Sequence, residues 1–87
     1  MGNRSRTEID GNILDASNGR TIKTKIMYSA FLSYKQLNKY LSILIEINLI
    51  EYLDGTKTFK TTEKGLNLLK IYDEMAELLQ QTTFKNN

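Results

Sequence analysis

The side chains available for chemistry in this chain are carboxylates, lysines, arginines, hydroxyls and amides, because its 87 residues include no histidine and no cysteine. Without cysteine there is no disulfide framework, no thiolate nucleophile and no Cys/His zinc site. Without histidine there is no imidazole for acid–base catalysis and no Ser-His-Asp triad. These absences exclude the common hydrolytic sites and also the zinc-finger route to DNA.

The remaining acidic residues do not form a catalytic or metal-binding pattern. Asp73 and Glu77 are one helical turn apart, a spacing at which exposed pairs are routinely solvated. Asp10-Gly11-Asn12 with Asp15 resembles a calcium loop only superficially, since the closing glutamate of an EF-hand is missing. No glycine-rich phosphate loop is present. We therefore expect no enzymatic activity, no metal, no cofactor and no small-molecule substrate.

Positive charge is concentrated in the middle of the chain, although the net charge is only +2. No acidic residue lies between Ala16 and Ile45, where five basic residues occur: Arg20, Lys23, Lys25, Lys35 and Lys39. A basic patch on a nearly neutral protein is typical of a nucleic-acid-binding surface. A solvated helix face is the simpler alternative for the same charges.

Capping patterns predict three helices in the first half of the chain. Ser5 and Glu8 fit a capping box for a helix over 6–17, which Asn18-Gly19 ends. Gly11 within this helix predicts close packing against a neighbour. A short helix over 22–29, capped by Thr21, precedes a second capping box of Ser33 and Gln36 and a helix over 34–47. Leucines recur in that third helix at helical spacing: Leu37, Leu41 and Leu44. Two helices so closely spaced predict a helix-turn-helix.

The apolar period then changes to that of strands. Residues 49–53 and 56–61 flank Asp54-Gly55, a favoured two-residue hairpin turn, and residues 20–22 could add a minimal third strand. Thr61 or Thr62 caps a final helix over 62–81, and we expect residues 82–87 to form a disordered tail. The predicted fold is therefore a single α+β domain over 1–87, mostly α: a winged helix-turn-helix with three helices, a β-hairpin wing and a long C-terminal helix.

The exposed face of the helix over 34–47 predicts contact with the major groove of duplex DNA. Helix N-terminal residues reach base edges there, lysine contacts guanine or phosphate, and Gln and Asn can read adenine. The wing over 52–60 would lie on the DNA backbone. The predicted DNA-binding residues are Lys23, Lys25, Ser33, Tyr34, Lys35, Gln36, Asn38, Lys39, Thr56, Lys57 and Thr58. Arg4 and Arg6 could extend to the duplex as an arm, although such charges are more often merely solvated.

The final helix has more apolar surface than one small domain needs to cover. An a/d pattern runs through it, and we expect its first half to pack on the core and its second half on a second copy of the chain. The predicted dimer interface comprises Leu68, Tyr72, Met75, Ala76 and Leu79.

The stretch TKIMYSAFLSYKQLNKYLSILIEINLIEY, followed by TTEKG, resembles the small archaeal winged-helix DNA-binding proteins. Within them it is most similar to the a-type ten-kilodalton chromatin proteins and their plasmid, viral and regulator relatives. The resemblance covers residues 9–79. It implies a homodimer joined by an antiparallel coiled coil of the C-terminal helices, with a winged domain at each end that binds double-stranded DNA. The resemblance implies that the wing is Asp54 to Thr58 and that the recognition-helix positions are Ser33, Tyr34, Lys35, Gln36, Asn38 and Lys39.

The sequence thus predicts a transcription regulator or a chromatin protein, and no secretion signal or bilayer-length apolar run is visible. We expect a soluble cytoplasmic protein associated with the nucleoid. A different class, a winged helix that docks proteins and not DNA, is the alternative, because fold alone does not determine function. The acid-free basic stretch favours DNA, whereas a large apolar patch beside the third helix would favour protein.

Overall fold

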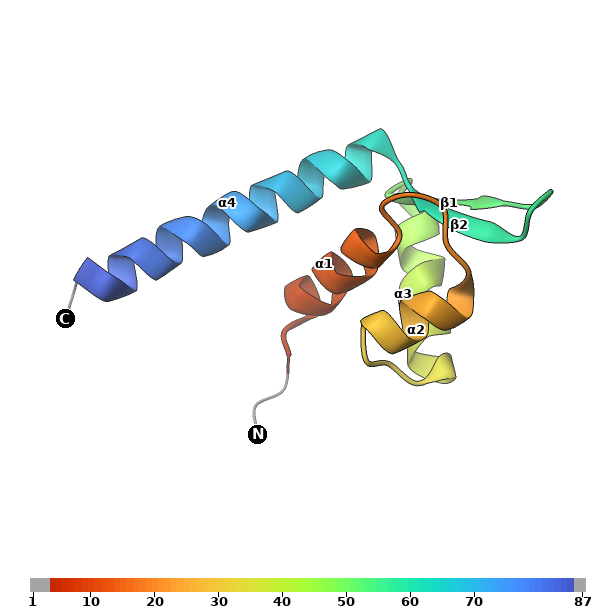
Figure 1. The fold of residues 1–87 in the computed structure, drawn as a ribbon, viewed down its shortest axis with the longest axis horizontal. Helices are drawn as coiled ribbons and strands as arrows, with labels where there is room; N and C mark the ends of the chain where they lie inside the picture. Colours follow the sequence, from red (N-terminus) through yellow and green to blue (C-terminus); the bar gives the residue numbers. More distant parts are fainter. Residues whose placement is uncertain (1–3, 86–87) are drawn as a thin grey trace.

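The computed structural model describes residues 4–85 of the chain, with the side chains of residues 4–80. The elements follow one another as α1 (Arg6–Ala16), α2 (Lys23–Ser29), α3 (Tyr34–Glu46), β1 (Ile50–Leu53), β2 (Thr58–Thr61) and α4 (Glu63–Lys85). In Figure 1, α2 crosses α3, the β1–β2 hairpin projects to one side, and α4 extends past α1 on the other side. This is the winged helix-turn-helix that the sequence predicts.

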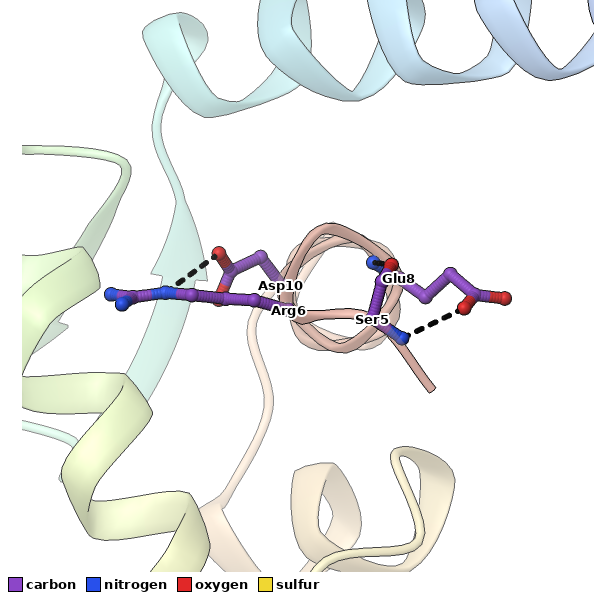
Figure 2. Close-up of polar contacts among 4 residues, drawn as sticks. All are labelled: Ser5, Arg6, Glu8 and Asp10. Carbon is purple, nitrogen blue, oxygen red and sulfur yellow. Dashed lines mark hydrogen bonds and ion pairs between the residues drawn. The ribbon is translucent and has the colours of Figure 1, made fainter. Parts of the chain in front are cut away.

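Both predicted capping boxes are present. The Ser5 hydroxyl accepts a hydrogen bond from the Glu8 amide at 3.1 Å, and the Glu8 carboxylate accepts one from the Ser5 amide at 2.9 Å (Figure 2). Ser33 and Gln36 form the same reciprocal pair at the start of α3. Each box satisfies two amides that a helix N-terminus otherwise leaves without a partner.

The start of α2 differs from the prediction. The helix begins at Lys23 with Ile22 at the N-cap position, and no side chain caps it. Thr21 does not serve as the cap because its backbone is held elsewhere. Its amide and carbonyl exchange hydrogen bonds with Phe59 at 3.0 and 2.7 Å. This isolated bridge is the predicted third strand, reduced to a single residue.

The hairpin has a longer loop than predicted. Leu53 pairs with Thr58, so four residues, 54–57, connect the strands. The prediction of a two-residue turn at Asp54-Gly55 is therefore wrong. The positive φ of this loop, 54°, falls at Lys57. The amides of Thr56 and Lys57 donate to the carbonyls of Leu53 and Asp54, three residues back in each case. Four-residue hairpin loops are commonly built around such turns.

One hydrophobic core joins the first three helices and the hairpin. Its fully buried members include Ile13 and Leu14 of α1, Ile26 of α2, Leu37 and Leu44 of α3 and Ile50 of β1. The Tyr52 and Phe59 rings, paired across the strands, lie 4.9 Å apart between centroids. The periodic apolar residues of α3 therefore face inward, as predicted, and the opposite face of this helix is left to solvent.

The last helix is anchored at its first turn. The Thr62 hydroxyl accepts from the Gly65 amide at 3.1 Å and donates to the Asn48 carbonyl at 2.7 Å. A side chain at Gly65 would overlap the Leu49 carbonyl and would approach the methyl carbon of Thr61 to 2.6 Å. Gly11 lies against the Tyr72 ring of α4, where an added Cβ would meet the ring at 3.4 Å, an ordinary van der Waals contact. The predicted packing of α1 at Gly11 is therefore present, but it does not exclude a side chain there.

The helix α4 continues to Lys85, beyond the predicted end at residue 81. No glycine or proline follows Gly65, so nothing in the sequence ends the helix sooner. The backbone of residues 82–85 is thus helical where a disordered tail was expected. Residues 86 and 87 lie outside the described part of the chain.

Candidate nucleic-acid interface

A stripe of polar side chains runs along α3 on the side opposite its buried leucines. The stripe comprises Lys35, Lys39, Ser42 and Glu46, spaced by four, three and four residues, and all four are exposed. Its two lysines lie in the first half of the helix. Glu46 lies about 16 Å beyond Lys35 along the helix axis, at 1.5 Å per residue. The N-terminal half of α3 is therefore the part with the charge to meet a polyanion.

Beside this stripe, a groove with a volume of about 400 Å³ separates α3 from the hairpin. The groove is lined by both apolar and polar side chains of α2, α3 and the hairpin: Lys23, Asn38, Leu41, Ser42, Ile45, Tyr52, Lys57 and Phe59. The fold thus brings three predicted DNA-binding residues, Lys23, Asn38 and Lys57, to one groove. They come from three elements and are far apart in the sequence.

Lys23 is the most constrained lysine of this surface. Its ammonium group donates to Oδ1 of Asn38 at 2.7 Å. It also lies 5.0 Å from the centroid of the Tyr34 ring and 5.9 Å from that of Phe59. A cation this close to aromatic faces is attracted by the ring quadrupole. Lys23 is therefore half-buried and oriented before any ligand arrives, whereas Lys25, Lys35 and Lys39 are exposed.

Two amide side chains predicted to read bases make hydrogen bonds within the protein. The Gln36 carbonyl oxygen accepts from the Ser33 amide at 3.0 Å, and the Ser33 hydroxyl accepts from the Gln36 amide at 3.2 Å. Asn38 accepts from Lys23. The acceptor atoms of both amides are thus engaged within the protein. The Gln36 bond belongs to the capping box that the sequence predicts, whereas the Lys23–Asn38 bond joins residues fifteen apart and has no local sequence signal.

The tip of the hairpin is held by its own hydroxyl groups. The Oγ1 atoms of Thr56 and Thr58 lie 2.6 Å apart in a hydrogen bond. Lys57 follows the turn in the left-handed region and extends its side chain to the groove. Of the three predicted wing contacts, Lys57 is therefore the one that lines the groove beside α3.

The two arginines near the N-terminus do not form an extended arm in the structure. Arg4 donates through Nη2 to the Phe31 carbonyl at 3.1 Å. Arg6 lies 3.8 Å from the Asp10 carboxylate, one turn further along α1 (Figure 2). Both residues are engaged with the protein itself.

Three exposed aromatic side chains flank the turn between α2 and α3, of which the sequence predicted Tyr34 alone as a surface contact. Phe31 is 83% exposed and has a φ of 54°. Tyr28, in the last turn of α2, and Tyr34, in the first turn of α3, are also exposed. The sequence held one signal for this. Only Phe31 and Leu32 separate Ala30, the C-cap of α2, from the capping box of α3, so the chain must turn sharply there and one of the two side chains must face outward.

The long helix α4 is covered along its first half only. Leu68 and Leu69 pack against the core of their own chain, so Leu68 is not free for a partner. An open groove of about 630 Å³ lies between α1 and α4. The residues of α4 that line it include Leu69, Tyr72, Met75, Ala76 and Leu79. Ile71 and Met75 are about half exposed, and Leu78 and Leu79 more so. Four of the five predicted dimer residues thus line this groove.

Two further features bear on the class of protein. No helix among the described residues is long and apolar enough to cross a membrane. Within the same part of the chain, no group of three acidic, histidine or cysteine side chains could hold a metal ion.

Comparison with known proteins places this arrangement in a family. Residues 3–80 match the winged helix-turn-helix family. The chain belongs to that family. It is 35% identical over 78 residues to an uncharacterized protein of Methanocaldococcus jannaschii, a match that covers 88% of this chain and 75% of the relative. Its fold matches that of Sso10a-2, a DNA-binding protein from Sulfolobus solfataricus, with a TM-score of 0.72, 25% identity and coverage of 94% and 92% of the two chains. The resemblance to small archaeal winged-helix proteins is thereby confirmed.

Proposed function

We propose that this protein binds duplex DNA without catalysing a reaction on it, as a homodimeric transcription regulator or architectural protein. The observation that carries the proposal is the convergence of lysines from α2, α3 and the hairpin beside the exposed face of α3. Lys23 and Lys57 line the groove, and Lys35 and Lys39 extend the charge along the helix. The similarity to Sso10a-2, which is described as a DNA-binding protein, supports the same function.

In the proposed complex, the N-terminal half of α3 enters the major groove and the hairpin follows the adjacent backbone. Lys23, Lys25, Lys39 and Lys57 contact phosphates, which supply most of the affinity. Lys35 and the NH₂ groups of Gln36 and Asn38 face base edges, because the acceptor oxygens of these two amides are used within the protein. Ser33, Tyr34, Thr56 and Thr58 flank these contacts.

The proposed dimer joins two chains through α4. Met75, Ala76 and Leu79 form the centre of the interface, and Tyr72 forms its edge against α1. Isologous contacts of this kind close a two-fold dimer. A dimer carries twice the basic surface, which makes phosphate binding effective despite a charge of +2 per chain.

Titration of duplex DNA at several salt concentrations tests the function directly. We expect affinity to fall steeply with salt. Lys39→Ala, which removes one phosphate contact from each chain, should reduce the slope of log affinity against log salt by about 0.9 per chain, or about 1.8 per dimer. Lys35→Ala should weaken binding with a smaller change of slope, because Lys35 faces base edges in the proposed complex. Lys70→Ala removes the same charge from exposed α4 and serves as the control, with an unchanged slope. Absence of binding at about 50 mM salt, where phosphate contacts are strong, would refute the proposal.

The mass of the protein in solution tests the dimer. We expect the wild type to have twice the mass of the chain and Met75→Glu to be monomeric. Asn67→Glu adds the same charge to an exposed position in the first half of α4 and should leave the dimer intact. A monomeric wild type would contradict the assignment of α4.

Footprinting on genomic fragments distinguishes the two proposed roles. Discrete protected sites would indicate a regulator, and uniform coverage an architectural protein. A chain that leaves all DNA unprotected but captures a protein through α3 would instead match the alternative, a winged-helix interaction module.

A further inference from the structure

The turn between α2 and α3 holds a phenylalanine in a conformation that penalises its side chain. Two hydrogen bonds end α2 in a Schellman motif: the Leu32 amide donates to the Met27 carbonyl, and the Phe31 amide to the Tyr28 carbonyl. Phe31 occupies the left-handed position of this motif, with a φ of 54°. Glycine or asparagine is usual there, because a Cβ atom crowds the following carbonyl.

The end of α3 shows what the same motif looks like with a favoured residue. There the Leu49 amide donates to the Leu44 carbonyl and the Asn48 amide to the Ile45 carbonyl. Asn48 has a φ of 67° and fills the position that Phe31 fills in α2. The chain therefore uses an accommodating residue at one turn and a bulky aromatic one at the other.

Packing does not account for Phe31. Its side chain is 83% exposed, whereas the next residue, Leu32, is buried in the core. The backbone of Phe31 is additionally held by Arg4, which donates to its carbonyl at 3.1 Å. The exposed ring adds little to the stability of the fold, although the backbone at Phe31 is strained. Residues with backbone strain of this kind cluster at binding sites.

The surroundings of Phe31 fit a polyanion. It lies two residues before Ser33, the N-cap of α3, and so within about 8 Å of it along the chain at 3.8 Å per step. Arg4 contacts it, exposed Lys35 follows in the first turn of α3, and the stretch from Ala16 to Ile45 contains no acid. In the proposed complex the N-terminus of α3 enters a groove about 12 Å wide, and a residue this close to it would reach the groove edge.

We propose that Phe31 contacts DNA and packs its ring on the C5-methyl group of thymine at the edge of the major groove. This inference rests on the proposed function. Thymine is the base that presents an apolar group in that groove, and phenylalanine is among the residues that contact it. Phe31 thereby gives the protein a preference for thymine beside the bases that α3 reads.

The test compares alternating A·T duplex with the same duplex in which deoxyuridine replaces thymidine, so that only the methyl groups are lost. Wild-type protein should bind the uridine duplex about fourfold more weakly for each bound chain, the effect of one buried methyl group, and so about fifteenfold more weakly as a dimer. Phe31→Asn should bind the thymidine duplex with a similar loss and show no further loss on the uridine duplex. Phe31→Leu, which keeps an apolar side chain, should retain part of the preference.

Phe31→Asn should fold, since asparagine suits the left-handed region, and its midpoint of thermal unfolding should rise by about 4–8 °C. Asn48→Gly is the control at the equivalent turn and should bind both duplexes as the wild type does. If the wild-type protein binds neither duplex, the proposed function itself is overturned. Equal binding of both duplexes by the wild type would overturn the thymine contact. A Phe31→Asn protein that binds like the wild type but has a lower mass in solution would show that Phe31 contacts another chain.

Discussion

The ammonium group of Lys23 lies 2.7 Å from the side-chain oxygen of Asn38, fifteen residues further along the chain. This hydrogen bond joins the first turn of α2 to the exposed face of α3. The Tyr34 and Phe59 rings hold the same ammonium group from α3 and from the hairpin. One lysine thus connects the three elements of the proposed DNA-binding surface.

The Lys23–Asn38 pair predicts how charge at the groove controls binding. Lys23→Met keeps the aliphatic chain and removes the ammonium group, so the slope of log affinity against log salt should fall by about 0.9 per chain, or about 1.8 per dimer. Asn38→Asp should produce a similar fall, because a carboxylate so close to Lys23 neutralises it. Asn38→Ala leaves the charge of Lys23 in place and should keep the slope. Salt titrations of duplex DNA provide the measurement, and an unchanged slope in Lys23→Met would exclude Lys23 from the phosphate contacts.

The capping box of α3 predicts a stability effect at Ser33. Ser33→Ala removes the hydroxyl that accepts from the Gln36 amide and should lower the free energy of unfolding by about 1 kcal/mol. Ser42→Ala changes the same residue type at an exposed mid-helix position and should have little effect. Denaturant unfolding of the two variants gives the comparison. Equal stability of both variants would show that the cap does not support the helix.

The first turn of α4 predicts a severe effect at Gly65. An alanine Cβ there would overlap the Leu49 carbonyl and crowd the Thr61 methyl group. Because backbone must move to make room, Gly65→Ala should destabilise the fold by about 1–3 kcal/mol. Gly55→Ala in the hairpin loop is the control, since no atom lies within 4 Å of the added carbon. If the two variants unfold at the same denaturant concentration, the close approach at Gly65 is not a constraint.

The contact between α1 and α4 predicts a pH effect at Asp10. Burial raises the pKa of Asp10, and the nearby Arg6 guanidinium partly offsets this. The folded state therefore binds the Asp10 proton more tightly than the unfolded state does. Stability from this group is present below its unfolded pKa of 3.8 and is lost as pH rises through the folded value.

Asp10→Asn removes that titration. The variant should be more stable than the wild type at neutral pH, and the difference should shrink as pH falls toward 3.8. Burial and the Asp10 charge also raise the pKa of Tyr72, in that order of size. The pKa of Tyr72, followed by NMR, should therefore fall in the variant. A pKa of Tyr72 that does not change would show that the two groups do not interact.

Features encoded within a few residues were predictable. The two capping boxes, the inward leucines of α3 and the order of elements all depend on neighbours three or four residues apart. A neighbour packed against Gly11 was also predictable, because glycine within a helix is costly and often marks a packed position, although a Cβ there would meet that neighbour only at ordinary contact distance. That this neighbour is Tyr72 was not predictable.

Where local and long-range interactions compete, the long-range ones decided the outcome. Thr21 has the chemistry of a helix cap, but its backbone pairs with Phe59 and α2 begins later. Asp54-Gly55 favours a tight turn, but the strand register opens a four-residue loop with Lys57 in the left-handed region.

The amino-acid sequence by itself determined the winged helix-turn-helix, the face of α3 that is exposed to solvent and the concentration of positive charge. These follow from residue type and from the period of the apolar residues. Only the tertiary structure decided that Lys23 is oriented by Asn38 and by two rings, and that Gly65 has no room for a side chain. It also decided that Phe31 stands exposed in the left-handed region. The physical reason is distance along the chain. These relationships join residues brought together by packing of the core, and no local pattern encodes which partners that packing will select.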